Sequence, residues 1–168
     1  MAQPLIAPER VDIHIESADQ PAVRALLAAL DDYLGSLYEP QDNHILSVDE
    51  LRSPQVHFLV ARRLGRAVGC AAFRRMPGEA ATGGRPYGEI KRMMVEPAAR
   101  GGGIGAALLE CLERQLVDEG LRLALLETGE AQRQAVRLYQ RCGYGRRAAF
   151  GGYPDNGLSL FFEKALGE

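Results

Sequence analysis

The sequence of 168 residues has few of the features that mark specialised classes of protein. No apolar stretch approaches the roughly 20 residues that a membrane-spanning helix needs. The first ten residues lack the basic start and the long apolar run of a signal peptide. The three cysteines are odd in number and show no CxxC spacing, which argues against a disulfide framework and a zinc site. We therefore expect a cytoplasmic protein without a membrane partner or a bound metal.

An excess of charge of one sign is also absent. The 20 Lys and Arg residues nearly balance the 22 Asp and Glu residues, which gives a formal net charge of −2. Proteins that bind nucleic acid in general, or anionic membranes, usually carry a basic excess, so we expect neither partner. The 46% of apolar residues is ordinary for a globular protein. We predict a single domain over residues 1–168, with its core at about 11–164.

Hydrophobic periodicity predicts an alternation of strands and helices. The predicted order, β-α-β-β-β-α-β-α-β-β, indicates an α/β or α+β fold with a mixed sheet. Asp19 is the predicted N-cap of the first helix, because Pro21 follows it. The expected strands are at 11–15, 56–75 (a hairpin), 90–95, 121–127, 144–150 and 158–164; the expected helices begin near Pro21, 103 and 131, with a short turn at 48–51.

Four glycines gather between the strand at 90–95 and the helix after it, at positions 101, 102, 103 and 105. Without Cβ atoms, several backbone N–H groups of such a loop can approach one anion. The N-terminus of the following helix adds free donors and a partial positive charge. This segment therefore predicts a phosphate cradle, and a simple tight turn is the alternative interpretation.

Two other phosphate-binding loops were compared with this segment. A Walker loop is excluded, because no Gly-Lys-Ser/Thr follows. The relaxed dinucleotide pattern fits Gly101-x-Gly103-x-x-Ala106, and the next predicted strand ends in Glu127. Five residues, including Pro97, separate the strand from Gly101, however, and the loop starts late in the chain. A dinucleotide-binding oxidoreductase stays as a remote alternative.

Two motifs together resemble a known family. Arg100-x-x-Gly103-x-Gly105 matches the Q/R-x-x-G-x-G/A signature of the GNAT family of N-acetyltransferases, and the segment 135–144, AVRLYQRCGY, is similar to its helix-to-strand segment. The segments 126–129 and 150–153 resemble a bacterial subgroup of small acetyltransferases. The resemblance covers about 11–164 and implies a mixed, mostly antiparallel sheet of about seven strands with helices on both faces.

The resemblance implies direct transfer of an acetyl group from acetyl-CoA to a primary amine of a small molecule or peptide. Gln132 stands where many members carry an asparagine that contacts coenzyme A. A catalytically idle acyl-CoA-binding module is the alternative from another class, and homodimers are frequent in the family. The coenzyme-binding positions implied are Met94, Val95, Arg100, Gly101, Gly102, Gly103, Ile104, Gly105, Ala106, Gln132 and Tyr139.

Two residues are predicted to move protons. An amine with a pKa near 10.4 is almost fully protonated at pH 7, so a general base is needed. The resemblance implies Glu89 as this base; an ordinary ion pair with a neighbouring cation is the alternative, and His44 and His57 are further candidates. Tyr139 lies in the family's general-acid position and is expected to protonate the leaving thiolate, with a packing role as the alternative.

The acceptor site is predicted from side chains that can hold one ammonium group. Aromatic, carboxylate and short polar groups suit this task by ion pairing and cation–π contact. They come from two segments that the family's architecture implies at one pocket: Tyr33, Tyr38 and Glu39 early in the chain, and Tyr153, Asp155 and Asn156 late.

Overall fold

One sheet of seven strands organises the chain, in the order β1-β2-β3-β4-β5-β7-β6. The computed structural model describes residues 10–167. The strands are β1 (Val11–Ile15), β2 (Val56–Arg63), β3 (Arg66–Met76), β4 (Tyr87–Val95), β5 (Leu123–Gly129), β6 (Gly145–Arg147) and β7 (Ser159–Ala165). The α-helices are α1 (Pro21–Leu37), α2 (Val48–Leu51), α3 (Ile104–Asp118) and α4 (Arg133–Arg141).

The topology confirms the predicted fold class and element order. Within residues 10–167, β4 and β5 form the one parallel pair of the sheet, and the other neighbouring strands are antiparallel. A dinucleotide-binding domain is built instead on a mostly parallel, doubly wound sheet. The dinucleotide alternative is therefore excluded.

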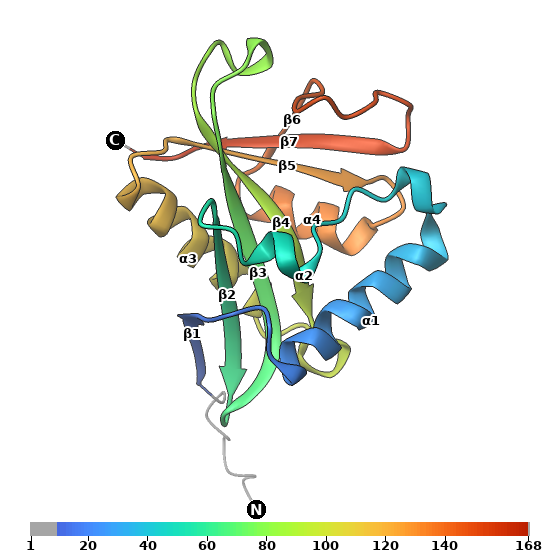
Figure 1. Cartoon of the computed structure of the whole chain (residues 1–168), viewed down its shortest axis with the longest axis vertical. Helices are drawn as coiled ribbons and strands as arrows, with labels where there is room; N and C mark the ends of the chain where they lie inside the picture. Colours follow the sequence, from blue (N-terminus) through green and yellow to red (C-terminus); the bar gives the residue numbers. More distant parts are fainter. Residues whose placement is uncertain (1–9, 168) are drawn as a thin grey trace, which may run out of the picture.

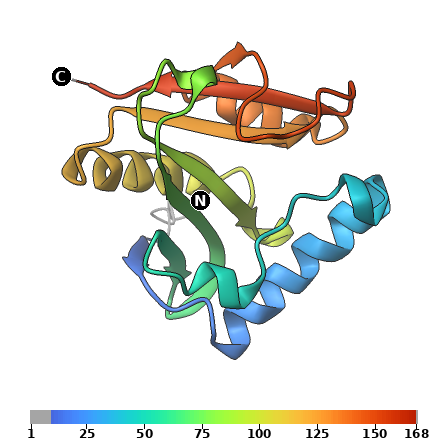
Figure 2. The ribbon, with the colours of Figure 1, turned by 45° about the horizontal axis from the view of Figure 1, so that its top comes forward.

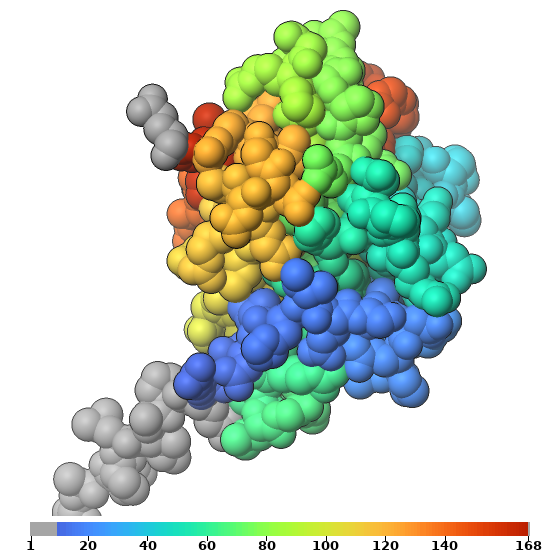
Figure 3. Space-filling model, turned by 60° about the vertical axis from the view of Figure 1, so that its left-hand side comes forward, coloured from blue at the N-terminus to red at the C-terminus, as the bar shows by residue number. Residues whose placement is uncertain are grey.

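Helices cover the two faces of the sheet (Figure 1). Helix α3 buries a leucine stripe on one face, with α4 beside it, and Leu108, Leu112 and Leu116 are fully enclosed there. Helix α1 packs on the other face through Val23, Leu27 and its neighbours. The space-filling view shows β1 and the segment after it, in blue, between the gold surface of α3 and the teal surface of the chain near α2 (Figure 3). Two apolar layers thus sandwich the middle strands.

The N-cap of the first helix lies one residue later than predicted. Its N-cap is Gln20, which has an extended backbone and no side-chain cap, and Pro21 occupies the first helical turn. A residue that precedes proline is forced into the extended region, so the cap falls on Gln20 and not on Asp19. The Asp19 carboxylate instead accepts a hydrogen bond from Arg24 Nε at 2.8 Å.

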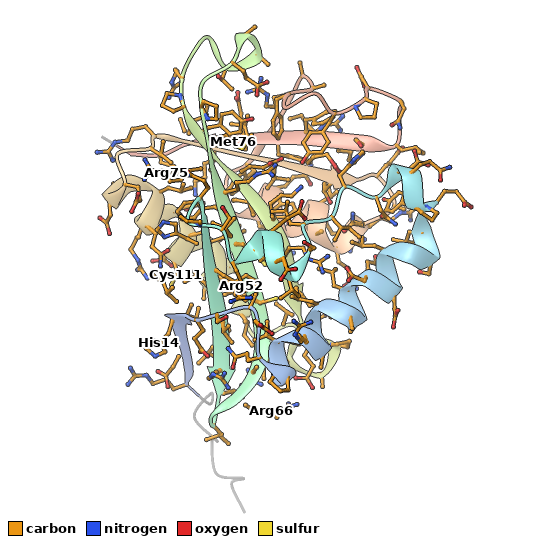
Figure 4. The ribbon with its side chains drawn as sticks, viewed as in Figure 1. His14, Arg52, Arg66, Arg75, Met76 and Cys111 are labelled. Atoms are coloured by element: carbon orange, nitrogen blue, oxygen red, sulfur yellow. The ribbon has the colours of Figure 1, made fainter. Side chains whose placement is uncertain are left out.

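Strand β6 is shorter than the predicted 144–150. Only Gly145–Arg147 pairs with β7. Phe150 then turns inward and packs against the rings of Tyr87 and Phe161. Met76, at the end of β3 in Figure 4, packs on the same aromatic cluster. Burial of an aromatic side chain outweighs the few ladder hydrogen bonds that a longer edge strand would add.

All three cysteines are free thiols. Cys70 is completely buried in β3, and burial raises its pKa to about 12. Cys142 and Cys111 are half-buried, and Cys111 lies on α3 (Figure 4), where its Sγ accepts a hydrogen bond from Arg114 Nη2 at 3.2 Å. A thiol with a raised pKa is a poor nucleophile at neutral pH, which makes Cys70 an inert core residue.

The parallel pair of strands separates soon after it forms. Gly88 pairs with Ala124 and Glu89 with Leu125, and no further pair joins β4 to β5 within the described chain. Beyond this point the two strands diverge, as Figure 2 shows. Arg92 has a φ of 58° and lies where the register between β3 and β4 shifts. Such a bulge bends its strand, and the bend opens a gap between β4 and β5.

Gly88 is expected to be essential at the point where the strands meet. A Cβ at this position would lie 2.1 Å from Leu116 Cδ2 of α3. Gly88→Ala should therefore lower the free energy of unfolding by about 1–3 kcal/mol, the usual cost of overpacking a core. Urea denaturation measures the effect, and Gly145→Ala, with no neighbouring atom within 4 Å, is the control. Equal losses in the two variants would contradict this packing argument.

Candidate functional site

The loop between β4 and α3 presents its backbone to solvent. After a 3₁₀ turn at Pro97–Ala99, Gly101 and Gly103 adopt left-handed conformations with φ of 84° and 81°. Gly103 is the N-cap of α3 and offers no side-chain cap. The first N–H groups of a helix have no intrahelical partner, and Gly101–Gly103 are all exposed. The geometry is that of an anion cradle made of backbone amides.

Arg100 connects this loop to the end of β4. Its Nε donates a hydrogen bond to the Val95 carbonyl at 2.9 Å. The Glu96 N–H donates to Val68 of β3, and backbone groups alternate in direction along an antiparallel strand. The N–H and carbonyl of Val95 therefore face the gap between β4 and β5. Met94, the other strand residue predicted to bind coenzyme, is buried opposite Cys70.

A pocket occupies the gap and is lined from both faces of the sheet. Helix α1 and the chain after it line one side, and the start of α4 lines the other. The polar and ionisable groups on its wall include Tyr38, His44, Lys91, Glu127, Gln132 and Tyr139. The divergence of β4 from β5 is what brings these groups together, because a continuous sheet would separate the two faces.

Glu127 is the carboxyl group on the wall of this pocket that the structure perturbs most clearly. Burial raises its pKa from 4.5 to about 7; the positive charge of Lys91 opposes this shift, and the negative charge of Glu89 adds to it. Within residues 10–167, no hydrogen bond or ion pair engages the Glu127 carboxyl group. A carboxyl group that is half ionised near pH 7 is suited to accept a proton.

Glu89, the base predicted from sequence, lies in a different environment. Only 1% of its surface is exposed, and it is absent from the pocket lining. Arg74 Nη2 donates to one carboxylate oxygen at 2.9 Å, and the Tyr153 hydroxyl donates to the other at 2.5 Å. The predicted catalytic role of Glu89 stays a prediction, and the geometry favours Glu127 for contact with an acceptor.

Tyr139 projects from α4 toward the sheet, as predicted. It is 6% exposed, lies among the rings of Tyr144 and Phe162, and lines the pocket. None of the hydrogen bonds of the described residues engages its hydroxyl group. Burial raises the pKa of Tyr139, so the hydroxyl stays protonated at neutral pH and can donate a hydrogen bond inside the pocket.

Tyr38 joins the end of α1 to the beginning of α4. Its hydroxyl oxygen accepts a hydrogen bond from the Ala131 N–H at 3.2 Å. A Cβ on Gly129 would lie 1.6 Å from this oxygen, so only glycine allows the close approach. Gln132, the N-cap of α4, also lines the pocket. Tyr38 and Gln132 thus lie together beside Glu127, although 94 residues separate them in the chain.

The structure disperses the other predicted acceptor residues. Tyr33 is 46% exposed on α1 and does not line the pocket. Tyr153 is turned toward Glu89, and Asp155 is exposed in the turn before β7. Glu39 lies on a second groove beside α4. Of the predicted acceptor set, the pocket keeps only Tyr38.

The two histidines also differ in position. His44 lines the pocket, and its ring contacts the edge of Tyr153. His57 stacks on Phe73 at 4.5 Å, with Glu119 at 3.8 Å, and it is outside the pocket. This excludes direct contact between His57 and anything bound in the gap.

Sequence reasoning missed Glu127 and Lys91 as site residues. Glu127 is the one charged residue of β5, LALLETG, and a lone charge in an apolar strand was the available signal. The sequence could not show which face of the sheet each residue occupies, because this depends on the β4–β5 register.

Membrane and metal features were also sought in residues 10–167. None of their helices is long and apolar enough to cross a membrane. No three of their His, Cys, Asp or Glu side chains are arranged to hold a metal ion.

Comparisons with known proteins show the family of this chain. A profile of the Acetyltransferase (GNAT) family matches residues 13–144. An IAA acetyltransferase of Azospirillum brasilense is 47% identical over 156 residues, which cover 93% of this chain and 98% of that protein.

Solved structures show the same fold. A candidate acyl-CoA N-acyltransferase of Klebsiella pneumoniae superposes with a TM-score of 0.74 at 34% identity, over 93% of this chain and 97% of that one. A GNAT acetyltransferase of Elizabethkingia anophelis with acetyl-CoA bound gives a TM-score of 0.62 at 19% identity, over 93% and 98% of the two chains.

Glu127→Gln should change how stability depends on pH. The pKa of Glu127 is raised in the folded state, so the folded protein binds this proton more tightly than the unfolded chain does. The resulting stabilisation of the fold is fully present below about pH 4.5 and is lost as pH rises through about 7. The shift corresponds to at most about 3 kcal/mol. In urea denaturation, the free energy of unfolding of the variant should rise relative to that of the parent protein between pH 5 and pH 8. The control is Glu130→Gln at an exposed position; parallel curves for parent and Glu127→Gln would contradict the perturbed carboxyl group.

Proposed function

Because the chain belongs to the Acetyltransferase (GNAT) family and is an acetyltransferase, we propose that it transfers the acetyl group of acetyl-CoA to a primary amine of a small molecule or peptide. One observation carries the proposal. The glycine cradle and the ionisable pocket lie at the two ends of the same unpaired edge of β4. A coenzyme held by its phosphates at one end can therefore extend along this edge to the other.

The residues of the loop fit the pyrophosphate of acetyl-CoA. The backbone amides of residues 101–106, of which 101–103 are exposed, supply several donors at a helix N-terminus, where the partial positive charge favours an anion. The gap-facing backbone of Val95 supplies a strand edge for the amide groups of the pantetheine arm. Its carbonyl already accepts a hydrogen bond from Arg100, so its N–H is the group in this position that can polarise the thioester carbonyl.

Glu127 is the proposed base. The acceptor nitrogen forms a bond to the thioester carbon while the carbon–sulfur bond breaks, and the proton lost by nitrogen passes to the Glu127 carboxylate. A pKa near 7 keeps a large fraction of this carboxylate ionised at neutral pH, and it leaves the group basic enough to take the proton.

Tyr139 is the proposed donor to the sulfur. Its hydroxyl is protonated, lies in the pocket and is buried against the sheet. A hydrogen bond to the thiolate strengthens as the negative charge develops on sulfur, so it stabilises the transition state more than the bound coenzyme.

The cradle can be tested by Gly102→Val. A Cβ at Gly102 would lie 3.5 Å from Arg63 Nη2 and 3.8 Å from the Ala99 carbonyl oxygen, so the fold accommodates it. The branched side chain should cover the neighbouring amides and weaken acetyl-CoA binding at least tenfold. A titration of the melting temperature with acetyl-CoA measures this affinity. Gly145→Val is the control, and a normal coenzyme response of Gly102→Val would place the cradle elsewhere.

The base can be tested by pH–rate profiles of Glu127→Gln and Glu89→Gln. The parent enzyme should lose kcat/KM as pH falls through about 7, because Glu127 becomes protonated. Glu127→Gln should lower kcat/KM by roughly 10²–10⁴ and abolish this acidic limb. Glu89→Gln should keep the limb. The reverse result would restore Glu89 as the base and refute the assignment to Glu127.

A further inference from the structure

Lys91 and Glu127 face each other across the gap without pairing. Glu89 and Leu125 form the last pair of the parallel ladder, and Lys91 and Glu127 each lie two residues further on. Side chains two residues apart share a face of the sheet, so both groups reach the same side of the pocket, and both line it. No ion pair joins either of them to another group within residues 10–167.

The ammonium group of Lys91 is held by neutral partners. It donates to the Tyr153 hydroxyl oxygen at 2.8 Å and to the His44 carbonyl at 3.1 Å. A lysine ammonium has three donors, and the third is left for the pocket. Burial lowers the pKa of Lys91, and the half-buried ammonium group has lost part of its contact with water. A bound anion would replace the missing solvation.

A series of hydrogen bonds behind Lys91 fixes the position of its ammonium group. The Tyr153 hydroxyl, which accepts from Lys91, donates in turn to Glu89, and Arg74 holds the other oxygen of Glu89. The ring of Tyr153 packs against Phe150. The ammonium group therefore needs little reorganisation to bind a ligand, which favours affinity.

A second cation lies beside Lys91 on the wall. The Arg92 side chain is 5% exposed and lines the pocket, and its Nη1 lies 2.6 Å from the Asp31 carboxylate. Its buried Nε has no hydrogen-bond partner. Asp31 balances the charge of Arg92, so Lys91 is the cation on the β4 side that lacks a carboxylate partner within residues 10–167, and the β5 side carries the Glu127 carboxyl group.

We infer that the acceptor is an amino acid, whose carboxylate binds the Lys91 ammonium group while its amine faces Glu127. The inference rests on the proposed function and narrows its substrate class. A zwitterion matches two separated and opposite charges, whereas a simple amine leaves the half-buried cation without an anionic partner, which is unfavourable. In this arrangement Tyr153 and Glu89 are positioning residues that act through Lys91.

Matched acceptors test the inference. Free amino acids, their carboxamides and their decarboxylated amines are compared by kcat/KM for acetyl transfer. The parent enzyme should prefer the acids by 30-fold or more. Lys91→Met should lower the ratio of kcat/KM for the acids to kcat/KM for the carboxamides at least 30-fold. Lys91→Arg, which keeps the charge, should restore part of the preference.

Tyr153→Phe separates positioning from folding. It removes the hydroxyl group and keeps the ring, so the ratio of kcat/KM for the acids to kcat/KM for the carboxamides should fall several-fold. An equal loss for acids and carboxamides in both variants would show a structural role only and overturn the inference. A parent enzyme that prefers the amides or amines would overturn it directly.

A binding measurement distinguishes this inference from the proposed function. Amino acids should raise the melting temperature of the parent protein but not of Lys91→Met, without acetyl-CoA present. If they do so and no amine is acetylated, the proposed transfer reaction fails and the amino-acid site stands. If amines are acetylated and amino acids neither bind nor react preferentially, the reaction stands and the amino-acid site fails.

Discussion

The early end of the β4–β5 ladder is the constraint on which the site depends. Two residue pairs join the strands before Arg92 diverts β4 at a bulge. A non-glycine residue in the left-handed region costs roughly 1–3 kcal/mol, so the surroundings must hold it there. The Asp31 carboxylate lies 2.6 Å from the Arg92 guanidinium group, and the Arg92 carbonyl accepts a contact from Cys70 Sγ at 3.5 Å. A bend secured in this way leaves a permanent gap in the middle of the sheet.

The same gap explains the unusual acidities around it. Removal of water disfavours the charged form of every titratable group, so it raises the pKa of Glu127 and Tyr139 and lowers the pKa of Lys91. Arg74 and Tyr153 each hold one oxygen of the Glu89 carboxylate. The Glu127 carboxyl group has no such partner within residues 10–167, and this difference in pairing is the reason to propose Glu127 as the base.

Local sequence signals predicted the parts of this structure that depend on short segments. The order of strands and helices along the chain, the exposed glycine loop and the inward position of Tyr139 follow from periodicity and from two motifs that span a few residues each. Such local signals could not decide between Glu89 and Glu127 as the base. The two residues lie 38 residues apart, and their surroundings depend on the register of the strands. Local signals also could not predict the position of Tyr153, which the sequence suggested as an acceptor contact. Its hydroxyl is directed to Glu89 by the packing of Phe150 and Phe161, an effect of tertiary structure alone.

The two halves of the site are built by different segments. The proposed coenzyme side depends on the loop between β4 and α3. The proposed acceptor side depends on a series of contacts that starts in the loop at 77–86, which projects from the sheet (Figures 1 and 3). There the Glu79 carboxylate accepts from the Tyr87 hydroxyl and from the Gly151 N–H, both at 2.8 Å. These bonds hold the turn that delivers Tyr153 to Lys91. None of these contacts involves the glycine loop. Substitutions among the contacting residues can therefore alter the proposed acceptor specificity while the glycine loop stays intact.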